Sequence, residues 1–333
     1  MEKSAEKEGK SRASKFACAP MMDWTDRHCR YFHRLLSPSA LLYTEMVTAE
    51  ALAHGDADRL LAFAPAEKPV VLQVGGCDPV KMAHAARLGA DAGYDAVNIN
   101  VGCPSDRVQD GQFGACLMDR PELVAECWQA MSEAVDIPVT VKTRLGIDDK
   151  DSDGFFLRFV DTVAEAGCTT FIVHARIAIL AGLSPKENRT VPPLNHERVY
   201  RLKERYPAFE IVINGGITSV AEAAAHLNRV DGVMLGRSAY HTPWVLTELE
   251  RALGDPAAAP ASRHAVVERM LPYIEQHLAT GGRLHHVTRH MIGLFAGCPG
   301  AKQWRRTLSE NAHRHDAGVE VVEEALTALP RAA

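Results

Sequence analysis

Eight short apolar segments recur along the first three quarters of the chain, and segments of helical length separate them. We expect strands at residues 16–21, 41–46, 70–74, 96–101, 139–143, 170–174, 211–214 and 232–235. The intervening segments mix polar and apolar residues, as at 79–92, 121–135, 155–166 and 220–228. Strand alternating with helix eight times predicts an α/β fold, a (β/α)8 TIM barrel with parallel strands. A doubly wound open sheet is the main alternative.

A Pro/Ala-rich stretch at residues 255–262 ends this alternation, and the rest of the 333-residue chain has the period of helices. A barrel of this kind commonly takes about 250 residues, which leaves room for one small appended domain. We therefore predict a flexible N-terminal tail at 1–14, the barrel at 15–255 and a helical-bundle domain at 256–333. The first helix of that bundle should have one apolar face, made by residues four apart: Val266, Met270, Ile274 and Leu278.

Composition narrows the class of protein. An apolar content of 47% and a charged content of 24% are those of an ordinary globular protein. No apolar run approaches the roughly 20 residues that span a bilayer. The start of the chain has no apolar segment and mixes Glu with Lys, which argues against secretory or organellar targeting. We expect a monomeric protein of the cytoplasm.

The cysteine spacing argues against a metal site, and the net charge argues against a general attraction to nucleic acid. The eight cysteines are scattered without a C-x-x-C pair, which predicts reduced thiols and no metal site. The formal net charge of −5 gives no general attraction to nucleic acid. Binding of RNA would therefore need local basic patches.

The fourth apolar segment opens into the richest cluster of chemically useful residues, Asn98-Ile-Asn-Val-Gly-Cys103-Pro104. A cysteine at the end of an apolar strand is commonly structural, and that alternative applies to Cys103. Gly102 and Pro104 instead favour a turn that directs the thiol away from the strand. Cys103 is therefore the first candidate for catalysis.

In a barrel the carboxyl ends of all strands meet on one face, so residues distant in sequence converge there. Asn214-Gly215-Gly216 and Gly236-Arg237 follow the last two strands, where such barrels often bind phosphate through exposed backbone N–H groups. Glycines that only shape the turns are the alternative. These positions predict a phosphate site.

Two further strand ends offer polar groups to the same face. Lys142 lies in the alternating strand Val-Thr-Val-Lys-Thr-Arg, where its ammonium faces either the barrel mouth or the helices. Gln73 ends the third strand, and its amide either bonds a ligand or satisfies loop backbone. A cation at the mouth would stabilise an anionic ligand.

Residues 98–118, NINVGCPSDRVQDGQFGACLM, resemble the signature of the flavin-dependent tRNA-dihydrouridine synthases. Residues 182–194, GLSPKENRTVPPL, are similar to the subgroup usually called A, and matching segments run from Phe16 to about His313. The resemblance implies an oxidoreductase with FMN in the barrel, NADPH as reductant and tRNA as substrate. It further implies reduction of the C5=C6 bond of D-loop uridines, at positions 20 and 20a.

The resemblance also implies a role for each candidate residue. His174 and Arg237 would contribute charge at the FMN phosphate, Lys142 would stabilise the reduced ring, and the methionines would offer thioether surface to it, although plain packing is their alternative. The residues expected to bind the cofactor are Pro20, Met21, Met22, Gln73, Lys142, His174, Asn214, Gly215, Gly216, Gly236 and Arg237.

The chemistry of uracil reduction suggests what Cys103 does. After hydride adds to C6, the carbon C5 must gain a proton. An unperturbed thiol has a pKa of about 8.5 and keeps its proton at neutral pH, so Cys103 can act as a general acid. That role predicts no strong positive charge beside the sulfur.

Basic residues in two segments are candidates for tRNA contact. Asn100 would hydrogen-bond the uracil edge, and the phosphate-binding residues would be Arg176, Lys186, Arg189, Lys302, Arg305 and Arg306, with Trp304 as a neighbouring aromatic. A merely solvated charged helix would read the same way. The rival functions are an FMN barrel that reduces a free small molecule and a non-catalytic phosphate-binding or RNA-binding barrel.

Overall fold

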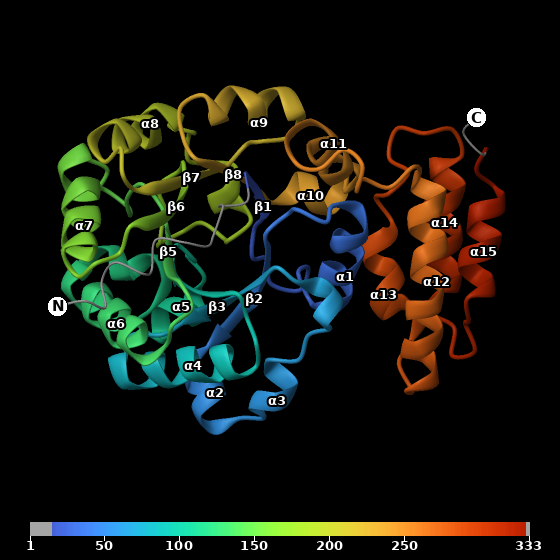
Figure 1. Cartoon of the computed structure of the whole chain (residues 1–333), viewed down its shortest axis with the longest axis horizontal. Coiled ribbons are helices and arrows are strands. Elements are labelled where there is room, and N and C mark those ends of the chain that lie inside the picture. The colour runs from blue at the N-terminus through green and yellow to red at the C-terminus, as the bar shows by residue number, and fades with distance from the viewer. Residues whose placement is uncertain (1–14, 331–333) are drawn as a thin grey trace.

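The computed structural model describes residues 15–330, and its centre is a barrel of eight parallel strands (Figure 1). The predicted tail at 1–14 lies outside the described residues. The strands are β1 (Phe16–Cys18), β2 (Leu42–Thr48), β3 (Val70–Gly75), β4 (Ala96–Val101), β5 (Val139–Thr143), β6 (Thr170–His174), β7 (Glu210–Asn214) and β8 (Gly232–Leu235). The predicted strands are confirmed, except that β1 ends at Cys18 instead of residue 21 and β2 extends to Thr48 instead of residue 46.

Closure of the sheet decides between the two folds that the sequence allowed. From β2 to β8 each strand pairs in parallel with the next one in sequence, and β8 pairs with β1. The gap between β1 and β2 is bridged at Ala17 and Leu41, where the Cys18 N–H donates to the Leu41 carbonyl at 2.9 Å. An open doubly wound sheet has two unpaired edges. The predicted (β/α)8 barrel is therefore confirmed.

Side chains alternate between the barrel interior and the helical layer with the period of two that strands impose. In β3, Val71 belongs to the small interior cluster, whereas Leu72 and Val74 pack among the helices. Nearer the carboxyl end the interior position is Gln73, which is polar. The barrel thus has an apolar base and a polar layer near its carboxyl face.

Helices surround the barrel, and three 3-10 turns lie in its connecting segments. The barrel helices are α1 (Arg27–Leu36), α2 (Ala49–His54), α3 (Ala57–Leu60), α4 (Pro79–Asp91), α5 (Asp106–Asp110), α6 (Pro121–Ala134), α7 (Asp153–Glu165), α8 (His196–Arg205), α9 (Val220–Leu227), α10 (Arg237–His241) and α11 (Trp244–Leu253), with 3-10 turns η1 (Pro65–Glu67), η2 (Gly114–Asp119) and η3 (Glu187–Arg189). The four helices predicted from sequence are confirmed to within two residues at each end. No helix among residues 15–330 is both long and apolar enough to cross a membrane.

After α11 the chain forms four more helices, which stand side by side next to α1 and α11 (Figure 1). They are α12 (Arg263–Ala279), α13 (Leu284–Met291), α14 (Ala301–Asn311) and α15 (Glu320–Thr327). The predicted apolar face of α12 is buried at Val266, Met270 and Ile274, while Leu278 is half-buried. Trp304 is fully buried and donates its indole N–H to the Met291 carbonyl. The expectation that Trp304 accompanies the basic residues at a surface is therefore wrong.

Helix α1 joins these helices to the barrel through its N-cap. The Asp26 carboxylate accepts the backbone N–H groups of His28 and Cys29, both at 2.9 Å. The same carboxylate pairs with Arg289 at 2.5 Å and with His290 at 3.0 Å, both on α13. Burial opposes its ionisation, but hydrogen bonds from His290, the Cys29 N–H and Arg289 outweigh burial and hold the Asp26 pKa well below its usual range. Asp26 is an ionised contact between the barrel and α13.

Asp26→Asn should destabilise the protein by about 1 to 3 kcal/mol, because charge-assisted hydrogen bonds to α13 are lost. Asparagine caps a helix as well as aspartate does, so the cap itself is kept. Asp78→Asn is the matched control, since exposed Asp78 caps α4 in the same way. Denaturant unfolding measures both variants. Equal losses of stability in the two would show that the contact with α13 contributes nothing.

Candidate functional site

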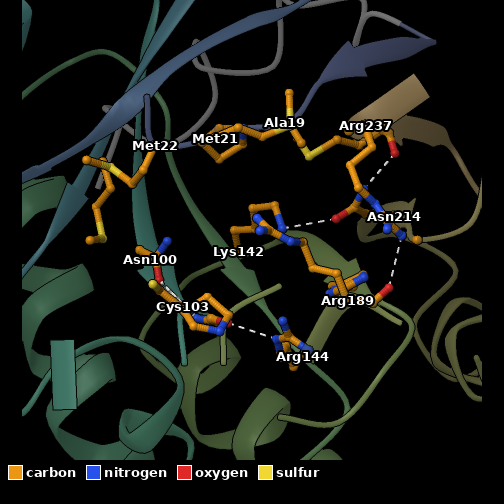
Figure 2. A pocket seen from close by; sticks show the side chains of 18 of the residues that line it. Ala19, Met21, Met22, Asn100, Cys103, Lys142, Arg144, Arg189, Asn214 and Arg237 are labelled. Atoms are coloured by element: carbon orange, nitrogen blue, oxygen red, sulfur yellow. Dashed lines mark hydrogen bonds between the residues drawn. The ribbon is translucent and has the colours of Figure 1, made fainter. Parts of the chain in front are cut away.

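A cavity of about 410 Å³ opens at the carboxyl ends of the strands. Figure 2 shows side chains from opposite walls turned toward it, with Lys142 on β5 and Cys103 in the turn after the neighbouring strand β4. Fourteen of the predicted site residues line this one cavity: Pro20, Met21, Met22, Gln73, Asn100, Cys103, Lys142, His174, Arg189, Asn214, Gly215, Gly216, Gly236 and Arg237. The convergence expected of a barrel face is therefore confirmed.

The turn after β4 presents the thiol of Cys103 to the cavity. The Asn100 side-chain oxygen accepts the N–H groups of Gly102 and Cys103, at 3.1 and 2.9 Å. The Cys103 carbonyl accepts the Ala115 N–H at 2.9 Å, and its sulfur lies 3.5 Å from the Ser105 hydroxyl. Cys103 is half-buried and borders the cavity. The turn that Gly102 favoured is confirmed.

Lys142 extends into the barrel and not toward the helices, which settles the alternative left open by its strand. Its ammonium donates to the Asn214 side-chain oxygen at 3.1 Å (Figure 2), and Asn214 donates in turn to the Met234 carbonyl. Burial, with repulsion from Arg144, lowers the Lys142 pKa to about 7, against a smaller opposing effect of Cys103. The cavity therefore holds an amine whose protonated form an anionic ligand would stabilise.

The corner of the cavity at the carboxyl ends of β7 and β8 has the features of an anion site. Gly215 and Gly216 take positive φ angles of 116° and 79°, which favour glycine. A Cβ at Gly215 would lie 2.8 Å from the His174 ring, so that glycine is needed for packing. At Gly236 a Cβ would meet only Ala19 and Met21, both at 3.8 Å. Packing does not require this glycine, which instead leaves open space at the cavity wall.

His174 does not supply the positive charge that was expected of it. Burial, followed by repulsion from Arg144, Lys142, Arg176 and Arg237, lowers the His174 pKa well below its usual value. The imidazole is therefore neutral at pH 7 and can act only through hydrogen bonds. Arg237 keeps its place at this corner and donates to the Arg189 carbonyl at 3.0 Å.

Comparison with known proteins agrees with this geometry. A family model described as dihydrouridine synthase (Dus) matches residues 17–330. The chain belongs to the dihydrouridine synthase family. Three relatives, each named tRNA-dihydrouridine(20/20a) synthase, come from Shewanella oneidensis, Yersinia pestis and Vibrio cholerae. They are 61%, 59% and 55% identical, over 92%, 94% and 96% of this chain and 91%, 90% and 98% of their own. The resemblance read from residues 98–118 is thereby confirmed, and the protein is an oxidoreductase of this family.

Five predicted residues of this dihydrouridine synthase do not line the cavity. Arg176 donates to the Pro192 carbonyl in the loop after β6, and Lys186 lies farther along that loop. The other three, Lys302, Arg305 and Arg306, are exposed on α14, where Arg306 pairs with Glu310 at 3.0 Å. Within residues 15–330, no group of three or more acidic, His or Cys side chains could hold a metal ion.

Arg144 is a cavity residue that the sequence reasoning missed. Its guanidinium donates to the carbonyls of Gly102, Ile177 and Asn188, at 2.8, 2.8 and 3.0 Å. It thereby ties the Cys103 turn to the loop after β6. The signal was present, because Arg144 directly follows β5 and comes two residues after Lys142, so it continues the same face.

Three cations, Lys142, Arg144 and Arg189, interact electrostatically with the Cys103 thiol, contrary to expectation. Burial lowers the Arg144 pKa to about 10, and attraction to Cys103 offsets part of that shift. Burial also lowers the pKa values of Lys142 and Arg189, and attraction to Cys103 offsets part of each shift. The prediction of no strong positive charge beside the sulfur is wrong. Such charges stabilise the thiolate that remains after a proton is given up.

Lys142→Met should stabilise the ligand-free protein at pH 7 by a few kcal/mol, because it removes a buried charge. The wild-type lysine has a folded pKa of about 7. The unfolded value is about 10.4, so between the two pH values the folded state releases the proton first and wild-type stability rises with pH. The advantage of the variant should therefore shrink toward pH 10. Denaturant unfolding at pH 7, 8.5 and 10 tests this, with exposed Lys150→Met as control. A pH-independent advantage would contradict it.

Proposed function

We propose that this protein is an FMN-dependent tRNA-dihydrouridine synthase that uses NADPH to reduce uridines 20 and 20a of the tRNA D-loop. The observation that carries the proposal is that Cys103 and Asn100 border the same cavity as Lys142 and the glycine corner at Gly215 and Gly216. The names of the relatives, which specify uridines 20 and 20a, support the substrate.

The residues of the cavity fit FMN. The cavity volume of about 410 Å³ falls within the range of about 300 to 1,000 Å³ typical of ligand sites. Gly215, Gly216, Gly236 and Arg237 would hold the phosphate through backbone N–H groups and one guanidinium, with His174 as a neutral donor. The other cofactor residues would hold the ring, with amide and ammonium groups at its polar edge and apolar side chains at its face: Pro20, Met21, Met22, Gln73, Lys142 and Asn214.

When bound and reduced by NADPH, FMN supplies the hydride that adds to C6 of uracil. The protein then has to deliver a proton to C5. Cys103 borders the cavity and gives that proton, leaving a thiolate. Lys142 and Arg144 stabilise the thiolate, because both interact electrostatically with Cys103. A proton from solvent then regenerates the thiol.

NADPH and the uridine would use the open side of the cavity in turn, which is ping-pong behaviour. A uridine in a folded D-loop has to leave its stack to reach the cavity, at a cost of a few kcal/mol. Basic residues outside the cavity would offset that cost by holding phosphates: Arg176, Lys186, Arg189, Lys302, Arg305 and Arg306. The helices that follow residue 255 would serve as the tRNA-binding domain.

The direct test measures dihydrouridine at positions 20 and 20a in tRNA from cells lacking the protein, before and after incubation with purified enzyme and NADPH. Both positions should be unmodified at first and become modified. An absorbance spectrum shows whether FMN is bound. Protein without flavin would favour a non-catalytic barrel. Reduction of free uridine as fast as tRNA would favour the rival small-molecule reductase.

Cys103→Ala should retain FMN and its reduction by NADPH but lose about 100-fold or more of the rate of dihydrouridine formation, since general acids typically contribute that much. Stopped-flow absorbance separates the two half-reactions. Cys116→Ala is the matched control, because Cys116 lies on the same loop and bonds the Phe113 carbonyl outside the cavity lining. Full product formation by Cys103→Ala would remove the thiol from the mechanism.

Lys302→Ala combined with Arg305→Ala should weaken tRNA binding and lower the slope of log K against log salt by about 1 to 2, the value for one or two lost phosphate contacts. Flavin content should not change, because both residues lie on α14 and away from the cavity. Arg158→Ala, an exposed arginine of α7, controls for general loss of charge. Binding measured from 50 to 300 mM salt decides, and an unchanged slope would exclude this face of α14.

A further inference from the structure

Four buried polar side chains form one chain of hydrogen bonds at the floor of the cavity. Asn100 donates to Gln73, Gln73 donates to Asn98, and Asn98 donates to the Thr140 hydroxyl, at 2.8, 2.8 and 2.9 Å. The residues come from β3, β4 and β5, where Gln73, Asn98 and Thr140 are direct neighbours in the sheet. Asn98 is fully buried and Thr140 is 8% exposed. We call these four residues, Gln73, Asn98, Asn100 and Thr140, the amide relay.

The end of the relay at the Cys103 turn has a fixed direction. The Asn100 oxygen accepts two backbone N–H groups, those of Gly102 and Cys103. A backbone N–H can only donate, so the Asn100 amide must keep its oxygen toward the turn. Its NH₂ group then faces Gln73, which has to present its own oxygen.

The same logic continues to the other end. Because the Gln73 oxygen faces Asn100, the Gln73 NH₂ group faces Asn98 and the Asn98 oxygen accepts it. The Asn98 NH₂ group then needs an acceptor, which is the Thr140 hydroxyl. That hydroxyl lies 3.5 Å from the Val97 carbonyl, which can only accept. The relay thus runs from two backbone donors to one backbone acceptor, and only one set of amide orientations satisfies it.

We propose that Asn98 and Thr140 are positioning residues, which act through the amide relay to hold Gln73, Asn100 and the Cys103 turn in the orientation that catalysis uses. Neither residue borders the cavity, whereas Gln73 and Asn100 do. The relay commits one N–H of each amide and leaves each a second N–H. The assignment rests on the proposed function for its catalytic meaning, but the orientation itself belongs to the ligand-free protein.

The energetics favour such a role. Reversal of any one amide would bring two NH₂ groups, or two oxygens, face to face in a buried site. Each unmatched group there costs about 1 to 3 kcal/mol, so the wild-type relay is strongly biased toward one direction. Removal of the Thr140 hydroxyl takes away the acceptor that sets the last amide. The bias at Asn98 and Gln73 should then weaken.

The test compares Thr140→Val with Thr140→Ser in flavin-free protein. Valine has the shape of threonine but no hydroxyl, whereas serine keeps the hydroxyl. We expect Thr140→Val to change the rate of Cys103 alkylation by iodoacetamide by about fivefold and to raise amide hydrogen exchange at residues 102–103 by a similar factor, as loss of about one hydrogen bond implies. Thr140→Ser should behave as wild type. Equal behaviour of the two variants, or wild-type values in both, would overturn the proposal.

A second comparison shows whether Thr140 acts through Asn98. In an Asn98→Leu background the relay is already interrupted, so adding Thr140→Val should change neither alkylation nor exchange further. Additive effects would contradict the relay. Thr247→Val controls for loss of a buried hydroxyl, because Thr247 donates to the Leu36 carbonyl on α1, away from the cavity. It should lower stability without altering Cys103.

Asn98→Asp offers a third variant should Thr140→Val not fold. Aspartate keeps an acceptor for Gln73 and receives the Thr140 hydroxyl instead of donating to it, so amide hydrogen exchange at residues 102–103 should match wild type, and faster exchange would count against the relay. In loaded enzyme, Thr140→Val should lower kcat for dihydrouridine formation more than it raises KM for tRNA, and Thr140→Ser should restore kcat. These readouts separate the two proposals. Relay effects without tRNA reduction would reject the function alone, and reduction with unaltered relay variants would reject the relay alone.

Discussion

Closure of the sheet between β1 and β2 is the constraint on which the rest of the structure depends. Residues at the carboxyl ends of strands from every part of the sheet line the cavity, Met46 and Gln73 among them. The hydrogen bond from the Cys18 N–H to the Leu41 carbonyl brings β1 beside β2. Without that closure Met21 and Gly236 would still be neighbours through β1 and β8, but Met46 and Gln73 would not face them across the cavity. The site exists because the barrel closes.

The charges of the cavity make sense only together. Lys142, Arg144, Arg189 and Arg237 line one small volume. Burial first, and repulsion between the cations second, lowers the pKa values of Lys142 and His174 there. Such an arrangement costs stability in the ligand-free protein. An anionic ligand relieves the repulsion, so the free energy of binding includes the relief of strain already present in the fold. The phosphate and reduced ring of the proposed cofactor carry suitable negative charge.

Local patterns in the sequence predicted most of the fold and much of the site. Short apolar segments predicted the strands, and the residues at their carboxyl ends predicted the cavity lining because barrel topology brings those ends together. Arg144 could have been found in the same way, because it comes two residues after Lys142 on the same face. The burial of Trp304 could not, because it depends on how the helices after residue 255 pack together. No local pattern records the meeting of Asp26 with His290.

The loop between β1 and α1 serves the cavity and the last helices at once. Met21 and Met22 line the cavity, and Asp26 bonds α13 a few residues later. Between them the Thr25 hydroxyl holds Met21, accepting its N–H at 2.9 Å, and Trp24 stacks on Tyr240 at 4.5 Å. So short and well-bonded a connection keeps the last helices at a fixed distance from the cavity. If the last helices bind tRNA as proposed, a fixed spacing between those phosphate contacts and the reacting base would lower the entropy cost of placing that base.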